Sequence, residues 1–394
     1  MEKPELLRLL SLVLHNTDMK PEPFDFPRCI SQAAPHGVAN MIYFAAAKLP
    51  ENLQPDAKIQ KTLTALFYNG LTRDTIQNRE MDELQEQFEK RKISMLPLKG
   101  YVIKNLYPES CMRTMSDTDI LIRADQALQA KNIFEELGFS FCGSNGSGNT
   151  DFYVSSAQMQ YEVHKDLEPE GARSEDRNFL KNLLSYGEPL PGKQCILRLP
   201  AEEHYIYILC HFIKHFLGHG IGIRQVMDVY LCRTQWNFDE QKLNTLLETM
   251  HLRIFSEHLE RLARFWFEDG EPDEMTEPLG DYIFNSGVFG NMENWVPNHM
   301  LKVQSQKKNY TMDRLFPSYA TMCFYYPSLK KAPVLLPICW CRRIFRAVFH
   351  GRKKLARELS AARNTDEEVL KERASFYQNC GLDVFENYRK GQKK

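Results

Sequence analysis

The chain has 394 residues, of which 43% are hydrophobic and 26% are charged, and its formal net charge is −1. This length predicts two or three domains, and the hydrophobic fraction is sufficient for a sizeable core. No segment approaches the roughly 18 consecutive apolar residues of a membrane-spanning helix, and the near-neutral charge argues against nucleic acid as a substrate.

Charge is unevenly distributed along the chain. Residues 301–394 hold 20 Lys and Arg against 8 Asp and Glu, a net charge of +12, which leaves −13 on the first 300 residues. We expect most of this basic segment to form solvent-facing helices, and an anionic partner such as a lipid headgroup, polyphosphate or nucleic acid stays open. None of the ten cysteines forms a Cys-x-x-Cys pair and no signal pattern begins the chain, so we expect reduced thiols and a cytoplasmic protein.

Residues 1–92 are predicted to be helical. Leu6, Leu10 and Leu14 recur at helical spacing, and residues 59–91 repeat the pattern with a densely charged outer face. We expect this N-terminal helical region to cover one side of a sheet.

The next segment, residues 93–200, is predicted to be an α/β core. Residues 93–98 form a short apolar strand that turns at Gly100 into a helix over 101–107. The free N–H groups at the start of such a helix favour an anion, and Lys99 beside the turn would add a positive charge.

A second strand, residues 117–122, begins with two acids. Asp117 and Asp119 share one face of this strand because side chains alternate. A helix over 124–137 follows and ends at Gly138, and two further strands surround a glycine-rich loop. In a last strand, residues 159–164, Glu162 and His164 point the same way, so a small mixed sheet brings the acids together.

Acids on adjacent strands suit a divalent cation. Mg²⁺ prefers hard oxygen ligands and takes the remaining ones from water and substrate phosphates. We predict that Asp117, Asp119 and Glu162 are catalytic groups that hold Mg²⁺ or Mn²⁺. Two alternatives stay open: the Asp-x-Asp pair lies in a surface turn, or Arg113 is an ion-pair partner of the aspartates rather than a substrate contact.

Pro200 precedes a predicted helical domain, residues 201–360, and residues 361–394 are predicted to form a charged C-terminal helix or tail. Four histidines fall near one helical stripe, which leaves zinc binding open as an alternative: His204, His211, His215 and His219. We also expect Arg224 and Asp228, one helical turn apart, to form a pair.

An apolar run near the C-terminus, residues 332–340, is interrupted by prolines and followed by arginines. We expect its helix to pack inside the C-terminal domain. Peripheral contact with an anionic membrane stays open, because Phe345 and Phe349 lie beside basic residues.

The order of these motifs resembles the uncharacterised nucleotidyltransferase family of the DNA polymerase β-like superfold, which is related to the aminoglycoside nucleotidyltransferases. The motifs that carry the resemblance are Lys99-Gly100, Arg113-x-x-x-Asp117-x-Asp119, Glu162-x-His164, His211 to His215, Gly222 to Asp228, Leu315 to Ser318, Tyr326-Pro327, and Leu335 to Pro337 near Arg342-Arg343. They extend over roughly residues 30–355.

The resemblance implies an α+β fold, in which a small mixed β-sheet nucleotidyltransferase core carries N-terminal helices and a large C-terminal helical domain. It implies transfer of a nucleoside monophosphate from a nucleoside triphosphate, with the three acids as metal ligands and Lys99-Gly100 as the phosphate turn. The other residues expected to contact the nucleotide or the acceptor are Arg113, His164, His215 and Arg224. The Lys-Gly turn departs from the usual Gly-Gly or Gly-Ser of the superfold.

The family relation favours a small molecule or sugar as the acceptor. Two alternatives stay open: a protein AMP-transferring enzyme of the antitoxin type, and a catalytically inactive module that binds nucleotide for interaction. The oligomeric state has no signature in the sequence.

Overall fold

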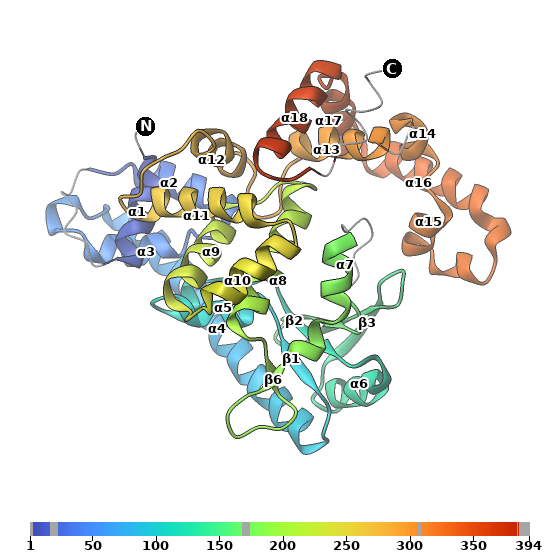
Figure 1. The fold of residues 1–394 in the computed structure, drawn as a ribbon, viewed down its shortest axis with the longest axis horizontal. Helices are drawn as coiled ribbons and strands as arrows, with labels where there is room; N and C mark the ends of the chain where they lie inside the picture. Colours follow the sequence, from blue (N-terminus) through green and yellow to red (C-terminus); the bar gives the residue numbers. More distant parts are fainter. Residues whose placement is uncertain (1–2, 16–22, 168–173, 306–308, 384, 386–394) are drawn as a thin grey trace.

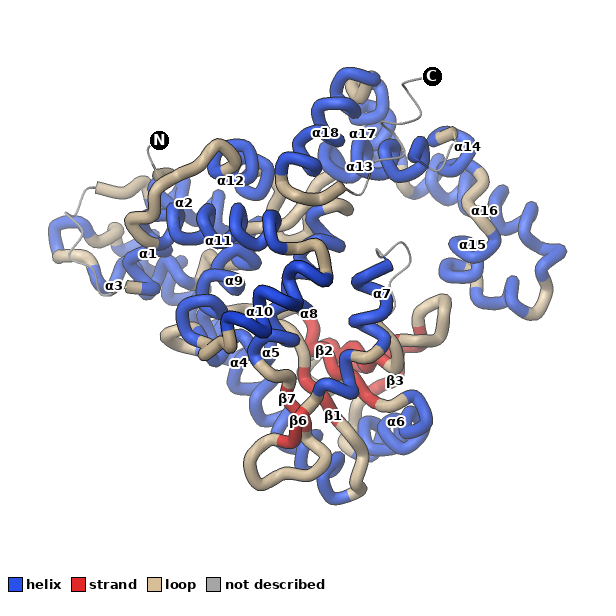
Figure 2. The backbone as a smooth tube through the Cα atoms, in the orientation of Figure 1, coloured by secondary structure: helices blue, strands red, loops and turns tan. Residues whose placement is uncertain are grey.

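Figure 1 shows the protein as a computed structural model, which describes residues 3–15, 23–167, 174–305, 309–383 and 385. It has an α+β architecture in which one five-stranded sheet adjoins a large helical part (Figure 2). The fold class expected from the sequence is therefore confirmed. Among the described residues, none of the helices combines the length and the hydropathy needed to cross a lipid bilayer.

The main sheet has the strand order β1-β2-β5-β4-β3. Its strands are β1 Met95–Pro97, β2 Asp117–Ile122, β3 Ser140–Ser144, β4 Thr150–Val154 and β5 Gln160–His164. β2 and β5 are parallel, and the other neighbours are antiparallel, so the predicted mixed sheet is confirmed. A separate two-stranded sheet joins β6 Glu188–Pro189 to β7 Leu197–Arg198.

One face of the main sheet is a hydrophobic core. Ile120 and Ile122 of β2 and Tyr161 and Val163 of β5 point to this face and are buried. They pack against the long helix α4 (Ala57–Lys90) and against α6 (Ala127–Glu136), which contribute Met81, Leu84, Phe88, Ile133 and Phe134. Strand alternation therefore places the odd-numbered residues of β2 and the even-numbered residues of β5 on the opposite face.

The helical part joins the sheet on the side of that opposite face. Its helices are α7 Ser174–Lys181, α8 Ala201–Phe216, α9 Ile223–Gln235, α10 Glu240–Thr249, α11 Arg253–Phe267 and α12 Thr276–Phe284. Leu96, Leu98 and Leu121 belong to the same buried cluster as the apolar residues of α8 and α9.

The first three helices differ from the expectation that the N-terminal region covers the sheet. α1 Glu5–Leu14, α2 Phe26–Ala33 and α3 Met41–Lys48 share their core with α11, and only α4 covers a sheet face. The reason is that α1 is apolar on most sides, so its leucines need helices around them.

The helix predicted over 101–107 is shorter than expected. α5 is Gly100–Ile103, and Lys104–Leu106 form a tighter 3-10 turn. Tyr107 is extended because Pro108 follows it, and this ends the helix.

The C-terminal helices lie along the top and the right of the molecule in Figure 1: α13 Met292–Ser305, α14 Tyr310–Leu315, α15 Tyr319–Tyr325, α16 Leu336–His350, α17 Arg352–Arg363 and α18 Glu367–Asn379. α18 is anchored by Tyr377, whose hydroxyl donates to Asn298 Oδ1 at 2.7 Å. The Tyr377 and Tyr282 hydroxyls also reach the Phe216 carbonyl at the end of α8, at 3.4 and 2.8 Å.

Candidate active site

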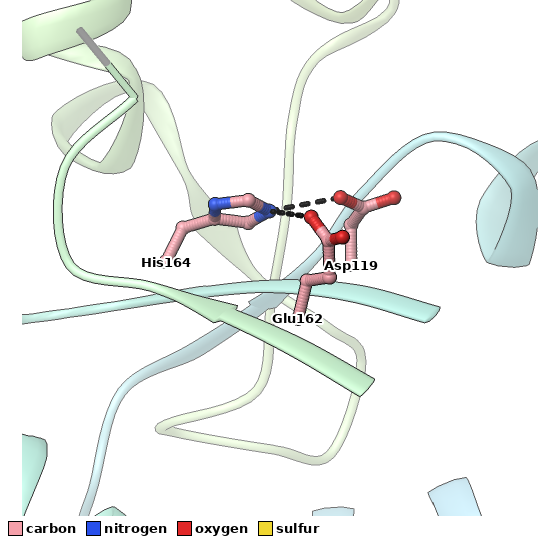
Figure 3. Close-up of side chains that lie close together, drawn as sticks. All are labelled: Asp119, Glu162 and His164. Atoms are coloured by element: carbon pink, nitrogen blue, oxygen red, sulfur yellow. Dashed lines mark hydrogen bonds and ion pairs between the residues drawn. The ribbon is translucent and has the colours of Figure 1, made fainter. Parts of the chain in front are cut away.

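Three side chains on two parallel strands converge: Asp119 of β2, and Glu162 and His164 of β5. Asp119 lies opposite Glu162 in the strand register, and Leu121 lies opposite His164. Their potential ligand atoms all lie within 4.8 Å of one another. Figure 3 shows His164 Nε2 directed at both acids, 2.8 Å from Asp119 Oδ1 and 3.7 Å from Glu162 Oε2. This is the one group in the described ranges with three or more clustered potential metal ligands.

The neighbouring strand orients the imidazole. Thr150 of β4 lies opposite His164, and its hydroxyl is 3.1 Å from His164 Nδ1. Both residues are buried. This contact holds the ring so that Nε2 faces the two acids.

Asp117 lies at the rim of this group. It precedes Asp119 by two residues on the same strand face and is half-buried, and its carboxylate accepts a hydrogen bond from the Ser116 hydroxyl at 2.9 Å. The pKa of Glu162 is raised by burial and by the negative charges of Asp119 and Asp117. Of the three predicted acids, the structure brings Asp119 and Glu162 together, with His164 as their third neighbour and Asp117 beside them.

Lys99 forms an ion pair with the central acid. Its Nζ lies 2.7 Å from Asp119 Oδ1, the same oxygen that His164 contacts. Burial opposes ionisation of Asp119, but the charge of Lys99 and the hydrogen bond from His164 outweigh it and hold the pKa of Asp119 well below its usual range. Burial likewise opposes the charge of Lys99, and Asp119 outweighs it, so the pKa of Lys99 is raised.

The Lys99-Gly100 turn has a backbone that normally favours glycine. Lys99 has φ +48° and ψ −124°, a region that side chains rarely adopt. A Cβ atom on Gly100 would overlap with Arg113 Nη1 and Met115 Sδ. Gly100 therefore makes room for these two side chains. The helix that follows has four residues, so its dipole is weaker than that of the helix predicted over 101–107.

Arg113 is paired with Asp228 and not with the strand aspartates. Its Nε and Nη2 donate to the two oxygens of Asp228 at 2.8 and 2.7 Å, and both side chains are buried. Tyr107 also donates to Asp228 Oδ1, at 2.8 Å. The expected Arg224–Asp228 pair is wrong, because Asp228 pairs with Arg113 through both of its oxygens.

Arg224 instead donates Nη1 to the Thr114 carbonyl at 2.7 Å, and its Nε is buried without a partner in the described part of the chain. Burial and the charge of Arg113 lower the pKa of Arg224 to about 10, while Asp228, Tyr107 and Asp117 act in the opposite direction. An arginine in this position retains donors for a ligand.

His215 lies in α8, one turn after His211, and the Nε2 atoms of the two rings are 3.1 Å apart. Burial lowers the pKa of His215 to about 4. The α8 histidines form no group of three ligands in the ranges that the structure describes, so nothing in their arrangement supports the zinc alternative.

Sequence reasoning missed two residues of α8 that face the acids. The charges of Lys99 and Asp119 act on the pKa of Tyr207, whose buried hydroxyl has no partner in the described ranges. Partial desolvation and the charge of Lys99 lower the pKa of Lys214, and no acid pairs with it in the described structure. Tyr207, His211 and Lys214 recur at helical spacing, and that spacing is the signal that could have identified them.

The site fits a divalent cation. Two carboxylates and one imidazole nitrogen converge, with their potential ligand atoms within 4.8 Å of one another, and a third acid, Asp117, lies beside them. Three basic groups interact with these acids: Lys99 forms an ion pair with Asp119, the charge of Lys214 interacts with Asp119 and Glu162, and the charge of Arg224 interacts with Asp117. A surface that combines acids for a metal with nearby cations suits a polyphosphate substrate.

Comparisons with known proteins agree with this chemistry. A family model described as uncharacterised nucleotidyltransferase matches residues 22–268, more than half of the chain. The match ends before the C-terminal motifs that the sequence analysis included in the resemblance. No curated protein matches.

A solved structure, that of the antibiotic-resistance factor ANT(2'')-Ia, aligns with 46% of this chain and 94% of its own, at 11% identity and a TM-score of 0.34. Likeness at this level supports no further conclusion. The match to the family model is sufficient: the chain belongs to the uncharacterised nucleotidyltransferase family, whose members are transferases of phosphorus-containing groups.

Proposed function

We propose that this nucleotidyltransferase transfers a nucleoside monophosphate from a nucleoside triphosphate to a hydroxyl of a small molecule or sugar, with Mg²⁺ or Mn²⁺ as cofactor. The observation that carries the proposal is the convergence of Asp119, Glu162 and His164 on one face of parallel strands. Asp117 at the rim supplies a further carboxylate.

The acids and His164 would hold the cation. A bound divalent cation neutralises the triphosphate and stabilises the charge that develops during in-line displacement. The imidazole nitrogen favours Mn²⁺ over Mg²⁺, because Mg²⁺ strongly prefers oxygen ligands.

The chain's own basic groups would position the triphosphate. Lys99 is the nearest cation to the acids, and its release from Asp119 would free its ammonium for a phosphate oxygen. Lys214 has no acid partner in the described structure, and Arg224 has a free Nε. These residues therefore provide point charges on the α8 and α9 side of the site.

Glu162 is the best candidate for general base. Burial and the adjacent acids raise its pKa, which favours uptake of a proton from the acceptor hydroxyl.

The acceptor would approach from the α8 side. His215 lies there, as does the Tyr207 hydroxyl, which has no partner in the described structure. A protein side chain as acceptor, as in AMP-transferring antitoxins, is the alternative within enzymes. We also propose a reducing, cytoplasmic compartment, in which the ten cysteines would stay thiols.

The test is pyrophosphate release with each of the four nucleoside triphosphates and Mg²⁺ or Mn²⁺, in the presence of small-molecule acceptors. Asp119→Asn and Glu162→Gln preserve side-chain shape and should each reduce turnover by at least about a hundredfold. The matched control is Asp125→Asn, an exposed acid just after the same strand that should leave turnover unchanged. Full turnover in Asp119→Asn with a native circular dichroism spectrum would refute the site.

A specific observation favours a second candidate, the catalytically inactive nucleotide-binding module. Lys99 occupies the Asp119 oxygen on which a cation would depend. Under this alternative, nucleotide raises the melting temperature equally with and without Mn²⁺, and no acceptor yields pyrophosphate. The enzyme requires a nucleotide-dependent shift that grows when Mn²⁺ is added.

A further inference from the structure

The C-terminal part of the molecule has an unusually apolar surface. We define the C-terminal arm as residues 309–363, which include α14 to α17. Of the 18 exposed large hydrophobic residues in the described structure, 12 lie between Met312 and Leu359. Figure 1 shows α15 and α16 projecting at one end of the molecule, away from the sheet. We propose that this arm docks on an anionic membrane surface, independently of the nucleotide chemistry.

The two sides of α16 have different surroundings. Trp340 on the inner side donates its indole N–H to the Pro317 carbonyl at 3.0 Å, and Leu336, Cys339 and Trp340 pack on the small core of Met322, Cys323 and Leu329. The expected helix packing is confirmed for this side.

On the outer side of α16, no element of the described structure covers the helix. Ile338, Phe345 and Phe349 follow one another at spacings of seven and four residues, so they share one helical face. They are 64%, 58% and 53% exposed. Val334, at the N-terminal approach to the helix, is 82% exposed. Exposed apolar side chains that share one helical face in this way mark an interaction surface.

Charge indicates the kind of partner. The arm has 11 Lys and Arg against two acids. Both acids are already paired inside the protein: Asp313 contacts His299, and Glu358 contacts Arg314. Arg342 and Arg346 are exposed beside the apolar stripe, so the outer face is apolar and cationic. A partner must therefore offer both negative charge and an apolar interior.

A lipid bilayer with anionic headgroups meets both requirements. α16 has 15 residues, too few to cross a bilayer but enough to lie in the interface with its phenylalanines among the acyl chains and its arginines at the headgroups. Single-stranded nucleic acid fits less well. Valine, leucine and isoleucine side chains cannot stack on bases as aromatic rings do.

The experiment uses the full chain and sedimentation with vesicles. We expect it to sediment with vesicles of phosphatidylcholine mixed with phosphatidylserine, weakly with phosphatidylcholine alone, and less as salt is added. The double variant Phe345→Ser with Phe349→Ser should bind at least about tenfold more weakly. The double variant Arg342→Gln with Arg346→Gln should bind these vesicles about 25-fold more weakly, because each charge contributes about fivefold to the affinity.

Matched controls exist elsewhere on the surface. Leu128→Ser removes a side chain of α6 that is 71% exposed, and Lys58→Gln with Lys61→Gln removes two exposed charges of α4. Both should sediment like the natural chain. Equal loss in these controls overturns the proposal, because binding would then follow total charge or hydrophobicity.

Three other outcomes also overturn it. Sedimentation with neither vesicle, or equally with both, removes the anionic membrane as the partner. Variant-sensitive binding of single-stranded RNA without vesicle binding assigns the surface to nucleic acid. A concentration-dependent dimer that Phe345→Ser with Phe349→Ser abolishes, seen by sedimentation velocity, assigns the surface to a second copy of the chain.

Discussion

Lys99 combines an unfavourable backbone conformation with a favourable ion pair. A left-handed φ at a non-glycine residue costs on the order of 1–3 kcal/mol, and it persists only where the surroundings enforce it. Here the enforcing contact is the 2.7 Å ion pair with the buried Asp119. The lysine thus acts as an internal counterion at the point where a metal would bind.

Replacement of this lysine tests that role. Lys99→Met should lower the free energy of unfolding without metal by about 1–3 kcal/mol, because the buried Asp119 loses its ion-pair partner and keeps only the contact with His164. It should also raise the affinity for Mn²⁺, since no cation must be displaced. Urea unfolding and calorimetric titration with Mn²⁺ alone measure the two effects.

The matched control is Lys92→Met, which alters a lysine with a similar φ of +58° and an exposed side chain. Both quantities should stay unchanged in this control. An unaltered Mn²⁺ affinity in Lys99→Met would show that Lys99 and the cation do not compete.

Among the elements, α9 is tied to the sheet region by one buried ion pair. Arg113 precedes β2 by a few residues, and Asp228 lies in the middle of α9. The pair, with Tyr107, joins segments that are more than a hundred residues apart in sequence.

Breaking this pair should destabilise the fold. Asp228→Ala leaves a buried arginine without its carboxylate and should cost about 3–5 kcal/mol in the free energy of unfolding. The double variant Arg113→Met with Asp228→Leu replaces both charges and should recover most of the loss. Chemical denaturation of the natural chain and the two variants measures the loss and the recovery. Similar losses in the single and double variants would contradict the account.

The strands could be predicted from the sequence, but the partners of their side chains were harder to predict. Alternation placed Asp117 and Asp119 on one strand face, because side-chain direction has a period of two. The pairing of Asp119 with Glu162 depends on register, which loop lengths do not define. The partner of Arg113 was not predictable, because any of several acids satisfies its charge and only the packing of α9 selects Asp228.

At the scale of the whole molecule, buried histidines make stability depend on pH. His36 and His204 are almost fully buried, and burial lowers the pKa of each to about 4. His36 donates from Nε2 to the Phe284 carbonyl and accepts the Ile223 N–H on Nδ1, so it must be neutral when folded. It joins the start of α9 to the end of α12.

We therefore expect stability to decrease on acidification. The folded pKa lies below the unfolded value of 6.5, so the contribution is complete above pH 6.5 and is lost as pH falls to about 4. The loss is on the order of 3 kcal/mol per histidine. Denaturation at several pH values gives the free energy of unfolding as a function of pH, and His36→Gln should make this dependence less steep between pH 6.5 and about 4. The control His251→Gln, at an exposed position, should not; identical slopes for all three proteins would contradict the expectation.

The large-scale arrangement was the part least visible in the sequence. Helical periodicity predicted that the N-terminal and C-terminal segments are helical, yet α1 packs on α11 and α3, and of the four N-terminal helices only α4 covers a face of the sheet. Periodicity reports which face of a helix is apolar and not which neighbour covers it. For the same reason it did not reveal that the outer side of α16 is exposed within the described ranges.

The hydroxyls of Tyr282 and Tyr377 on the Phe216 carbonyl bear on how the protein can be shortened. A fragment that stops at residue 268, where the family match ends, would lack both tyrosines, so the last turn of α8 would lose the Tyr282 donor and the Tyr377 hydroxyl that contacts it at 3.0 Å. That helix also carries Tyr207 and Lys214. Fragments made for crystallisation or assay should therefore retain α18, even though it lies far along the chain from the acids.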